Sequence, residues 1–233
     1  MSWLTYWNKK NIWTDSDIWK KNTEIFYKKT FDIFNYNKKH TVLDIGCGNG
    51  DFAKKISNKV GQVYCLDTSQ EFINLCKINV SNKNNIKILK LNNDYTNLSF
   101  LKNINFSIII ANSVVQYYRS QEEIMNLVKS VKKIAVKNAY FLIADIHVIG
   151  DKKKSYSKLI YNSLTNGYII SLMKMGLKIF MNKEFKDMIK YQPPLIVNLD
   201  KFIRDLSILA NKVTIINENL TINPDRRHLL IQF

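Results

Sequence analysis

The feature that most constrains this chain is a short apolar run that ends in alternating glycines. The run is Val42-Leu-Asp-Ile-Gly-Cys-Gly-Asn-Gly50, and a helix-like segment follows it. Gly46, Gly48 and Gly50 let the backbone turn sharply and approach a ligand closely. In open α/β sheets, ligands bind at such turns, beyond the carboxyl ends of the strands. The spacing differs from the G-x-G-x-x-G dinucleotide fingerprint, and no Walker A lysine follows.

The rest of the chain alternates short β-type runs with helical patterns, which predicts a doubly wound parallel sheet covered on both faces. Two further β-type runs lie too close together for a helical crossover, so they should pair antiparallel. The predicted fold is α/β, with a mostly parallel seven-stranded sheet, a helical insertion and a C-terminal antiparallel hairpin. The predicted strands are 41–45, 62–66, 86–91, 106–111, 139–146, 212–219 and 227–233, and helices are expected at 50–58, 69–79 and 120–133.

The chain of 233 residues has the length of one domain and contains no linker or repeat. We expect a single domain over 1–233, with a capping-box-like start at Thr14-Asp-Ser-Asp17 for its first long helix. Its expected parts are an N-terminal aromatic helical cap (1–40), a cofactor-binding core (41–148), a substrate-side insertion or lid (149–210) and the terminal hairpin (211–233). For the apolar stripe Tyr168–Met181, the sequence favours ordinary packing over a lid, and a lid over a membrane-surface helix.

Composition limits the partners that can be inferred. The net charge is +16, but it comes from 31 Lys and only 4 Arg, and arginine is the residue preferred for bidentate phosphate contacts. No apolar run approaches the roughly 18–20 residues of a membrane span, and no signal-peptide pattern opens the chain. The sequence therefore predicts a soluble, cytoplasmic protein. Three cysteines without metal-ligand spacing predict reduced, partly buried thiols and no metal site.

Several motifs occur in an order that resembles the class I S-adenosylmethionine-dependent methyltransferases. Their first motif, an apolar strand followed by D/E-x-G-x-G-x-G, is matched from Asp44 onward. Asp67 stands where that family places an acidic residue at the end of the second strand. The turn Asp94-Tyr-Thr-Asn-Leu98 is similar to the one near the adenine, and Asn112–Tyr118 is similar to the segment lining the methyl-transfer site.

This resemblance implies S-adenosylmethionine as the cofactor. Asp67 would accept hydrogen bonds from the ribose hydroxyls and Asp94 from the adenine amino group, while free amides near Gly46–Gly48 would suit the carboxylate. The residues alone leave open that Asp44 stabilises a turn and that Asp67 and Asp94 are helix caps. The expected cofactor-binding residues are Asp44, Gly46, Cys47, Gly48, Gly50, Asp67, Thr68, Asp94, Tyr95 and Asn112.

On the substrate side, the resemblance implies that the aromatic N-terminal segment folds over the pocket, although core packing would also explain it. The expected substrate or lid residues are Tyr6, Trp7, Trp13, Gln116 and Tyr117. Among the three histidines, His147 immediately follows a strand and would serve as general base, or would only make a structural hydrogen bond. His40 and His228 are expected to be structural.

The methyl acceptor is inferred mainly by elimination. The motifs of amino-directed nucleic-acid enzymes, pyrimidine C5 enzymes and ribose 2′-O enzymes are not found, which favours a small-molecule acceptor. The lysine surplus suits an anionic acceptor, such as a phosphorylated or nucleotide-linked metabolite, methylated on O or N. One alternative is an RNA methyltransferase that uses Lys152-Lys153-Lys154 and Arg226-Arg227. Another is a non-catalytic module that only binds the cofactor.

Overall fold

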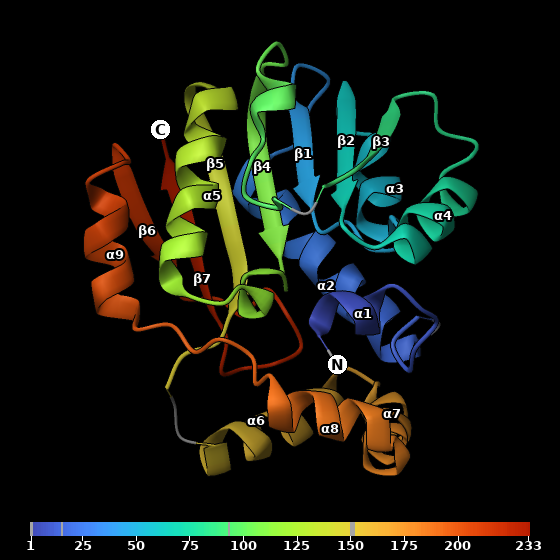
Figure 1. Cartoon of the computed structure of the whole chain (residues 1–233). Coiled ribbons are helices and arrows are strands. Elements are labelled where there is room, and N and C mark those ends of the chain that lie inside the picture. The colour runs from blue at the N-terminus through green and yellow to red at the C-terminus, as the bar shows by residue number, and fades with distance from the viewer. Residues whose placement is uncertain (1, 15, 93, 150–151) are drawn as a thin grey trace.

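The computed structural model describes residues 2–14, 16–92, 94–149 and 152–233, without the side chains of 152–155. Its sheet has seven strands in the order β3-β2-β1-β4-β5-β7-β6 (Figure 1). Strands β3, β2, β1, β4 and β5 run parallel, and β7 pairs antiparallel with both β5 and β6. The strands are β1 (Thr41–Ile45), β2 (Gln62–Asp67), β3 (Ile86–Lys90), β4 (Phe106–Asn112), β5 (Ala135–Ile146), β6 (Lys212–Ile216) and β7 (Arg227–Gln232). The predicted α/β fold and its terminal hairpin are confirmed.

Helices cover both faces of this sheet. They are α1 (Trp3–Trp7), α2 (Asp17–Phe34), α3 (Asp51–Ser57), α4 (Gln70–Asn79), α5 (Gln121–Ile134), α6 (Lys152–Thr165), α7 (Ile169–Met181), α8 (Lys183–Tyr191) and α9 (Leu199–Ser207), with 3₁₀ turns η1 (Ser99–Leu101) and η2 (Val115–Tyr117). One core cluster packs α5 and α9 onto the sheet through buried residues such as Val128 and Phe202. A second cluster packs α2, α3 and α4 onto the other face, through Phe26, Ile56 and Cys76. Burial of these apolar side chains from both faces is the main stabilisation of the fold.

The N-cap of helix α2 lies two residues after the predicted one, Thr14. Ser16 is the N-cap, because its Oγ accepts a hydrogen bond from the Trp19 amide at 3.1 Å. Thr14 instead accepts from the Asn11 amide at 3.0 Å, in the turn that precedes the helix. The capping-box prediction at Thr14 was therefore wrong by two residues. Ser16 supplies the same kind of side-chain oxygen to the helix N-terminus.

The insertion places α6, α7 and α8 beyond the carboxyl ends of the parallel strands, on the same side as α1, whereas its α9 packs on a face of the sheet with α5 (Figure 1). It contains α6, α7, α8 and α9, and the chain between α8 and α9 returns along the sheet edge. There the Leu195 amide donates to the Gln116 carbonyl, and the Val197 amide donates to the His147 carbonyl, both at 2.8 Å. The insertion is thus built against the ends of β4 and β5. Within the described residues, no helix combines the length and the apolar character that crossing a bilayer requires.

Candidate functional site

The glycine-rich loop joins β1 to α3 at the carboxyl edge of the sheet. Gly46, Gly48 and Gly50 all have positive φ, at 72°, 56° and 78°. A Cβ on Gly46 would lie 2.3 Å from a methyl group of Val114, and one on Gly50 would lie 2.5 Å from Cys76 Sγ. The alternate glycines are therefore required both by backbone conformation and by close packing.

The amides of this loop are satisfied within the protein. The Gly46 and Cys47 amides donate to the Leu66 carbonyl at 2.7 and 2.9 Å, and the Gly48 amide donates to Asp67 Oδ2 at 2.9 Å. The expectation of free amides for a ligand carboxylate was wrong for these three groups. The loop is fastened to the end of β2, so a ligand here meets side chains and loop edges more readily than open N–H groups.

Asp67 ends β2 and is almost fully buried. Besides the Gly48 amide, its carboxylate accepts from the Ser69 amide at 2.8 Å. Burial raises its pKa to about 6, although both amide hydrogen bonds oppose this. Asp67 is not the cap of α4, because Ser69 holds that position and accepts from the Phe72 amide. Thr68, half-buried, lies between the two.

Asp44 lies within β1, beside Cys65 in the sheet register, and is 4% exposed. Burial raises its pKa to about 8, with further contributions from Cys76 and Asp67. Its Oδ2 atom has no hydrogen-bond partner in the described part of the chain. A buried carboxylate oxygen without a donor is costly. The group is therefore suited to a hydrogen-bonding or cationic partner that is not part of this chain.

The three cysteines, far apart in the sequence, come together beneath the glycine-rich loop. Cys47, Cys65 and Cys76 are free and buried, and their sulfur atoms lie within 4.8 Å of one another. The prediction of reduced, buried thiols is confirmed. Their convergence could not be read from spacing, because one belongs to the loop, one to β2 and one to α4.

Asp94 and Tyr95 occupy an exposed turn after β3. Asp94 Oδ1 accepts from the Thr96 hydroxyl at 2.9 Å and from the Thr96 amide at 3.3 Å. The Tyr95 hydroxyl donates to Glu123 Oε2 at 2.9 Å. Asp94 thus stabilises its own turn and is not a helix cap, because the following 3₁₀ turn η1 has Leu98 as its N-cap. An adenine contact from Asp94 remains a prediction.

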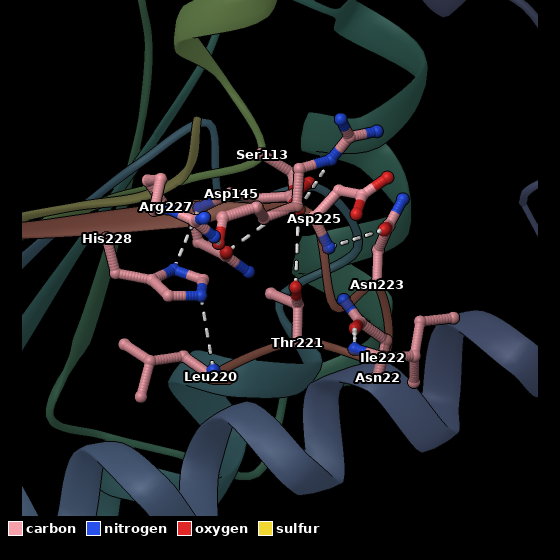
Figure 2. Close-up of polar contacts among 12 residues, drawn as sticks. Asn22, Ser113, Asp145, Leu220, Thr221, Ile222, Asn223, Asp225, Arg227 and His228 are labelled. Atoms are coloured by element: carbon pink, nitrogen blue, oxygen red, sulfur yellow. Dashed lines mark hydrogen bonds and ion pairs between the residues drawn. The ribbon is translucent and has the colours of Figure 1, made fainter. Parts of the chain in front are cut away.

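A polar network at the ends of β4 and β5 was missed by the sequence analysis (Figure 2). Its centre is Asp145, which accepts from the hydroxyls of Ser113 at 2.7 Å and Thr221 at 3.3 Å and pairs with Arg226 Nε at 3.2 Å. Ser113 and Asp145 have positive φ, at 57° and 65°. The half-buried Asn112 precedes this network. Residues with a strained backbone, such as this pair of polar residues in contact, cluster at functional sites.

His147 lies close to this network. Burial, with a smaller contribution from the positive charge of Arg226, lowers the pKa of His147 to about 4. His147 is therefore neutral at pH 7 but a weak proton acceptor. His228 is 1% exposed, as predicted for a structural residue, and its Nδ1 and Nε2 lie 3.1 and 3.2 Å from the Asp145 and Leu220 amides. A neutral imidazole can accept from only one of these amides at a time.

The aromatic N-terminal segment closes over the carboxyl edge of the sheet. The Trp7 ring lies 5.7 Å from the Phe72 ring and 5.6 Å from the Tyr117 ring, measured between centroids. The Trp7 carbonyl accepts from the Ser69 hydroxyl at 2.7 Å, beside Asp67. A Cβ on Gly48 would come within 3.2 Å of the Trp19 ring. This segment therefore rests directly on the glycine-rich loop.

Helix α8 completes this aromatic cap. Tyr6 is 1% exposed, its ring lies 5.6 Å from that of Phe185, and Trp13 packs against the same phenylalanine at 5.7 Å. Several polar atoms in and beside the cap are buried without a hydrogen-bond partner in the described residues: Trp3 Nε1, Tyr6 OH, Trp7 Nε1, Trp13 Nε1 and Gln116 Oε1. Such atoms are rare in folded proteins. Their gathering at one edge of the sheet is what a site for a polar ligand predicts.

Comparison with known proteins agrees with this geometry. The family described as "Methyltransferase domain" matches residues 42–138, which contain the glycine-rich loop and strands β1–β4. Residues 42–138 are thus similar to a methyltransferase domain, and S-adenosylmethionine is the cofactor that this similarity indicates. No curated protein matches this chain in sequence.

Solved structures share its fold. The phosphoethanolamine N-methyltransferase 1 of Haemonchus contortus matches at 14% identity and a TM-score of 0.51, over 61% of this chain and only 30% of that one. The N-methyltransferase NodS of Bradyrhizobium japonicum matches at 9% identity and a TM-score of 0.57, over 98% of this chain and 94% of that one. An rRNA methylase of Streptococcus thermophilus matches at 10% identity and a TM-score of 0.51, over 94% of this chain and 97% of that one. Identities this low show the fold and do not identify the acceptor.

The residues at this edge of the sheet fit S-adenosylmethionine chemically. S-adenosylmethionine carries a sulfonium cation, an ammonium group and two ribose hydroxyls. Asp44 and Asp67 are buried carboxyl groups on neighbouring strands, and Asp44 Oδ2 lacks a partner in the described residues. A carboxylate accepts hydrogen bonds from the donors of such a ligand, and its negative charge balances the positive charge of the ligand. A ligand with these groups would supply the partner that Asp44 Oδ2 lacks.

We expect the binding of S-adenosylhomocysteine, the demethylated cofactor, to strengthen as the pH rises. Hydroxyl donors favour the ionised form of Asp67, whose pKa in the free protein is about 6. Binding should therefore release a proton, and the Kd should fall by about tenfold between pH 5 and pH 7. Calorimetric titrations at both values measure this change. A Kd that is constant, or lower at pH 5, contradicts the assignment of Asp67.

Proposed function

We propose that this methyltransferase transfers a methyl group to an oxygen or nitrogen of a small anionic metabolite, such as a phosphorylated or nucleotide-linked one. The observation that carries the proposal is Arg226, a half-buried cation at the carboxyl edge of the sheet. Its charge acts on both His147 and Tyr117, which belong to the expected substrate side. Its guanidinium has five N–H donors, and the ion pair with Asp145 is made through Nε. Such a fork suits a phosphate or carboxylate.

In this proposal, Asp67 accepts from the ribose hydroxyls, and Asp44 faces the ammonium group directly or through water. The bound cofactor supplies an electrophilic methyl group on its positively charged sulfur. The cap residues Tyr6, Trp7 and Trp13 exclude water and hold the acceptor in line with that methyl group. Gln116 and Tyr117 line the same space from η2.

His147 is the candidate general base of the proposal. The pKa of about 4 keeps it unprotonated at neutral pH, which a base requires, but makes it weak. An anionic acceptor paired with Arg226 would offset the charge that helps to lower this pKa. We expect His147→Ala to lower kcat by about 100-fold or more with little change in the Kd of S-adenosylhomocysteine. An unchanged kcat assigns His147 to structure alone.

The acceptor is tested directly by incubation with cofactor labelled in its methyl group. Phosphorylated and nucleotide-linked metabolites form one arm, their uncharged counterparts a second, and RNA a third. Transfer to a member of the first arm supports the proposal. Transfer only to an uncharged counterpart or to RNA rejects the anionic small molecule and leaves methyl transfer intact.

Once an acceptor is found, Arg226→Gln is expected to raise its KM by about tenfold or more, because a charged hydrogen bond contributes about 1.5–3 kcal/mol. The matched control is Arg227→Gln, since Arg227 is exposed and its Nη1 donates to the Arg226 carbonyl. The Kd of S-adenosylhomocysteine should be unchanged in both variants. Equal effects of the two substitutions on KM argue against a specific role for Arg226.

RNA is the weaker alternative for the acceptor. Arg226 is half-buried at the sheet edge and therefore less accessible to a polymer, which leaves only Arg227 of that pair exposed. The side chains of Lys152, Lys153 and Lys154 lie outside the described residues. An RNA substrate would still give retention that weakens steeply with salt, because binding releases counterions from the phosphates.

A further inference from the structure

Helix α7 exposes an apolar face that the sequence analysis assigned mainly to packing. Its inner side does pack, through Leu172, Met175 and Ile179, against residues that include Ile18 of α2. Its outer side carries five large apolar residues, each 59–74% exposed: Ile170, Met173, Leu177, Phe180 and Met181. The packing prediction was therefore wrong for this outer half.

These five residues form one continuous stripe. Each helical residue advances by about 100°, so positions 170, 173, 177, 180 and 181 fall within an arc of about 100°. Helix α6, which packs against α7, also exposes Tyr156, Ile160, Tyr161 and Leu164, each 51–67%. We call the five residues of α7 the α7 stripe. Exposed apolar residues gathered in this way are uncommon on soluble proteins and mark an interaction surface.

The charges beside the α7 stripe indicate its partner. Lys174 and Lys178 are exposed and lie one turn apart at its edge. From residue 156 to residue 191 the sequence has six lysines and only two acidic residues, and one of these, Glu184, is paired with Lys9. This combination of an apolar stripe with flanking lysines complements an anionic lipid surface, where lysine stems lie along the apolar region and their ammonium groups reach the headgroups.

Length and symmetry support the same partner. Helix α7 has 13 residues, or about 20 Å, so it can lie in the interface but cannot cross a hydrocarbon core of about 30 Å. A second copy is a poorer match. A two-fold contact through this face would bring the lysines of both copies together without acidic residues to balance them.

We propose that the α7 stripe docks this protein onto a membrane surface that contains anionic phospholipid. The helix lies in the plane of the interface, with Leu177 and Phe180 inserted among the acyl chains and Lys174 and Lys178 at the headgroups. Because α7 and α8 also pack against the aromatic cap, docking brings the substrate side of the protein next to the lipid.

The test is co-sedimentation of the full chain with phosphatidylcholine vesicles that contain either no phosphatidylglycerol or 30% of it. We expect binding to the anionic vesicles that weakens with salt, and little binding to the neutral ones. Phe180→Ser should weaken the binding by about tenfold or more, because it removes a large inserted side chain. The matched control is Ile208→Ser, since Ile208 is 82% exposed and lies after α9.

The contribution of charge is tested by comparing Lys174→Gln with Lys129→Gln, because Lys129 is an exposed lysine on α5, away from the α7 stripe. Lys174→Gln should weaken binding several-fold and Lys129→Gln should not. Failure of the unaltered protein to bind anionic vesicles overturns the proposal. Binding that Phe180→Ser leaves intact overturns it as well, because only non-specific charge is then at work. A dimer in sedimentation equilibrium that Phe180→Ser dissociates, without vesicle binding, replaces the lipid with a second copy.

Discussion

Gly46→Ala is expected to lower the free energy of unfolding by about 2–5 kcal/mol. Two costs add: positive φ for a residue with a Cβ, about 1–2 kcal/mol, and overpacking, about 1–3 kcal/mol. The second cost arises because the new Cβ would lie 2.3 Å from Val114 Cγ2. Urea unfolding measures the change, which is a large fraction of the stability of a typical domain.

Two other glycines separate these costs. Gly167 also has positive φ, at 70°, but a Cβ there would meet nothing within 4 Å, so Gly167→Ala should show the conformational cost alone. Gly176, within α7, has neither constraint, and Gly176→Ala should be neutral or stabilising by up to about 1 kcal/mol. A Gly46→Ala protein as stable as Gly167→Ala would contradict the close packing of the loop against Val114.

Asp67→Asn is expected to weaken the binding of S-adenosylhomocysteine by about 10- to 100-fold. An amide keeps the size of the carboxyl group but loses its charge, and a hydrogen bond to a charged group contributes about 1.5–3 kcal/mol. The loss should be smallest at pH 5, where Asp67, with its pKa of about 6, is already largely protonated. Calorimetric titration of the variant at pH 5 and pH 7 measures both effects.

The matched control is Asp32→Asn, an exposed position on α2, which should leave the Kd unchanged. Asp94→Asn tests the second predicted aspartate. A loss of severalfold would support an adenine contact, whereas an unchanged Kd would leave Asp94 as the turn residue that accepts from Thr96. Tight binding by Asp67→Asn would remove Asp67 from the cofactor site.

Local patterns predicted the fold and the glycine-rich turn after β1 well. The strand before Gly46 and the acidic residue at the end of β2 each belong to a short continuous stretch of sequence. The order of these stretches resembles that of the family's motifs, so their places in the fold could be predicted. The state of the loop amides was not predictable, because their acceptors are the carbonyl of Leu66 and the side chain of Asp67 on another strand. Predicting them requires the three-dimensional pairing of β1 with β2.

The rest of the site depends on contacts between segments far apart in the chain. Asp145 lay unnoticed inside an apolar strand, and its partners Thr221 and Arg226 come from the hairpin region about 80 residues later. The sequence did contain one indication of this network, because Asp145 is a carboxylate near the carboxyl end of a β-type run, two residues before His147. The α7 stripe was misassigned because apolar periodicity alone does not tell which face of a helix is covered.

We propose that the glycine-rich loop and Asp67 bind S-adenosylmethionine beneath the aromatic cap. All four tryptophans of the chain, Trp3, Trp7, Trp13 and Trp19, lie in the first 19 residues, so intrinsic fluorescence reports on that cap. Titration of the full chain with S-adenosylhomocysteine should give a saturable fluorescence change with a 1:1 endpoint, and Asp67→Asn should shift its midpoint by about tenfold or more. A folded protein whose fluorescence and calorimetric heat do not respond to S-adenosylhomocysteine would contradict the account.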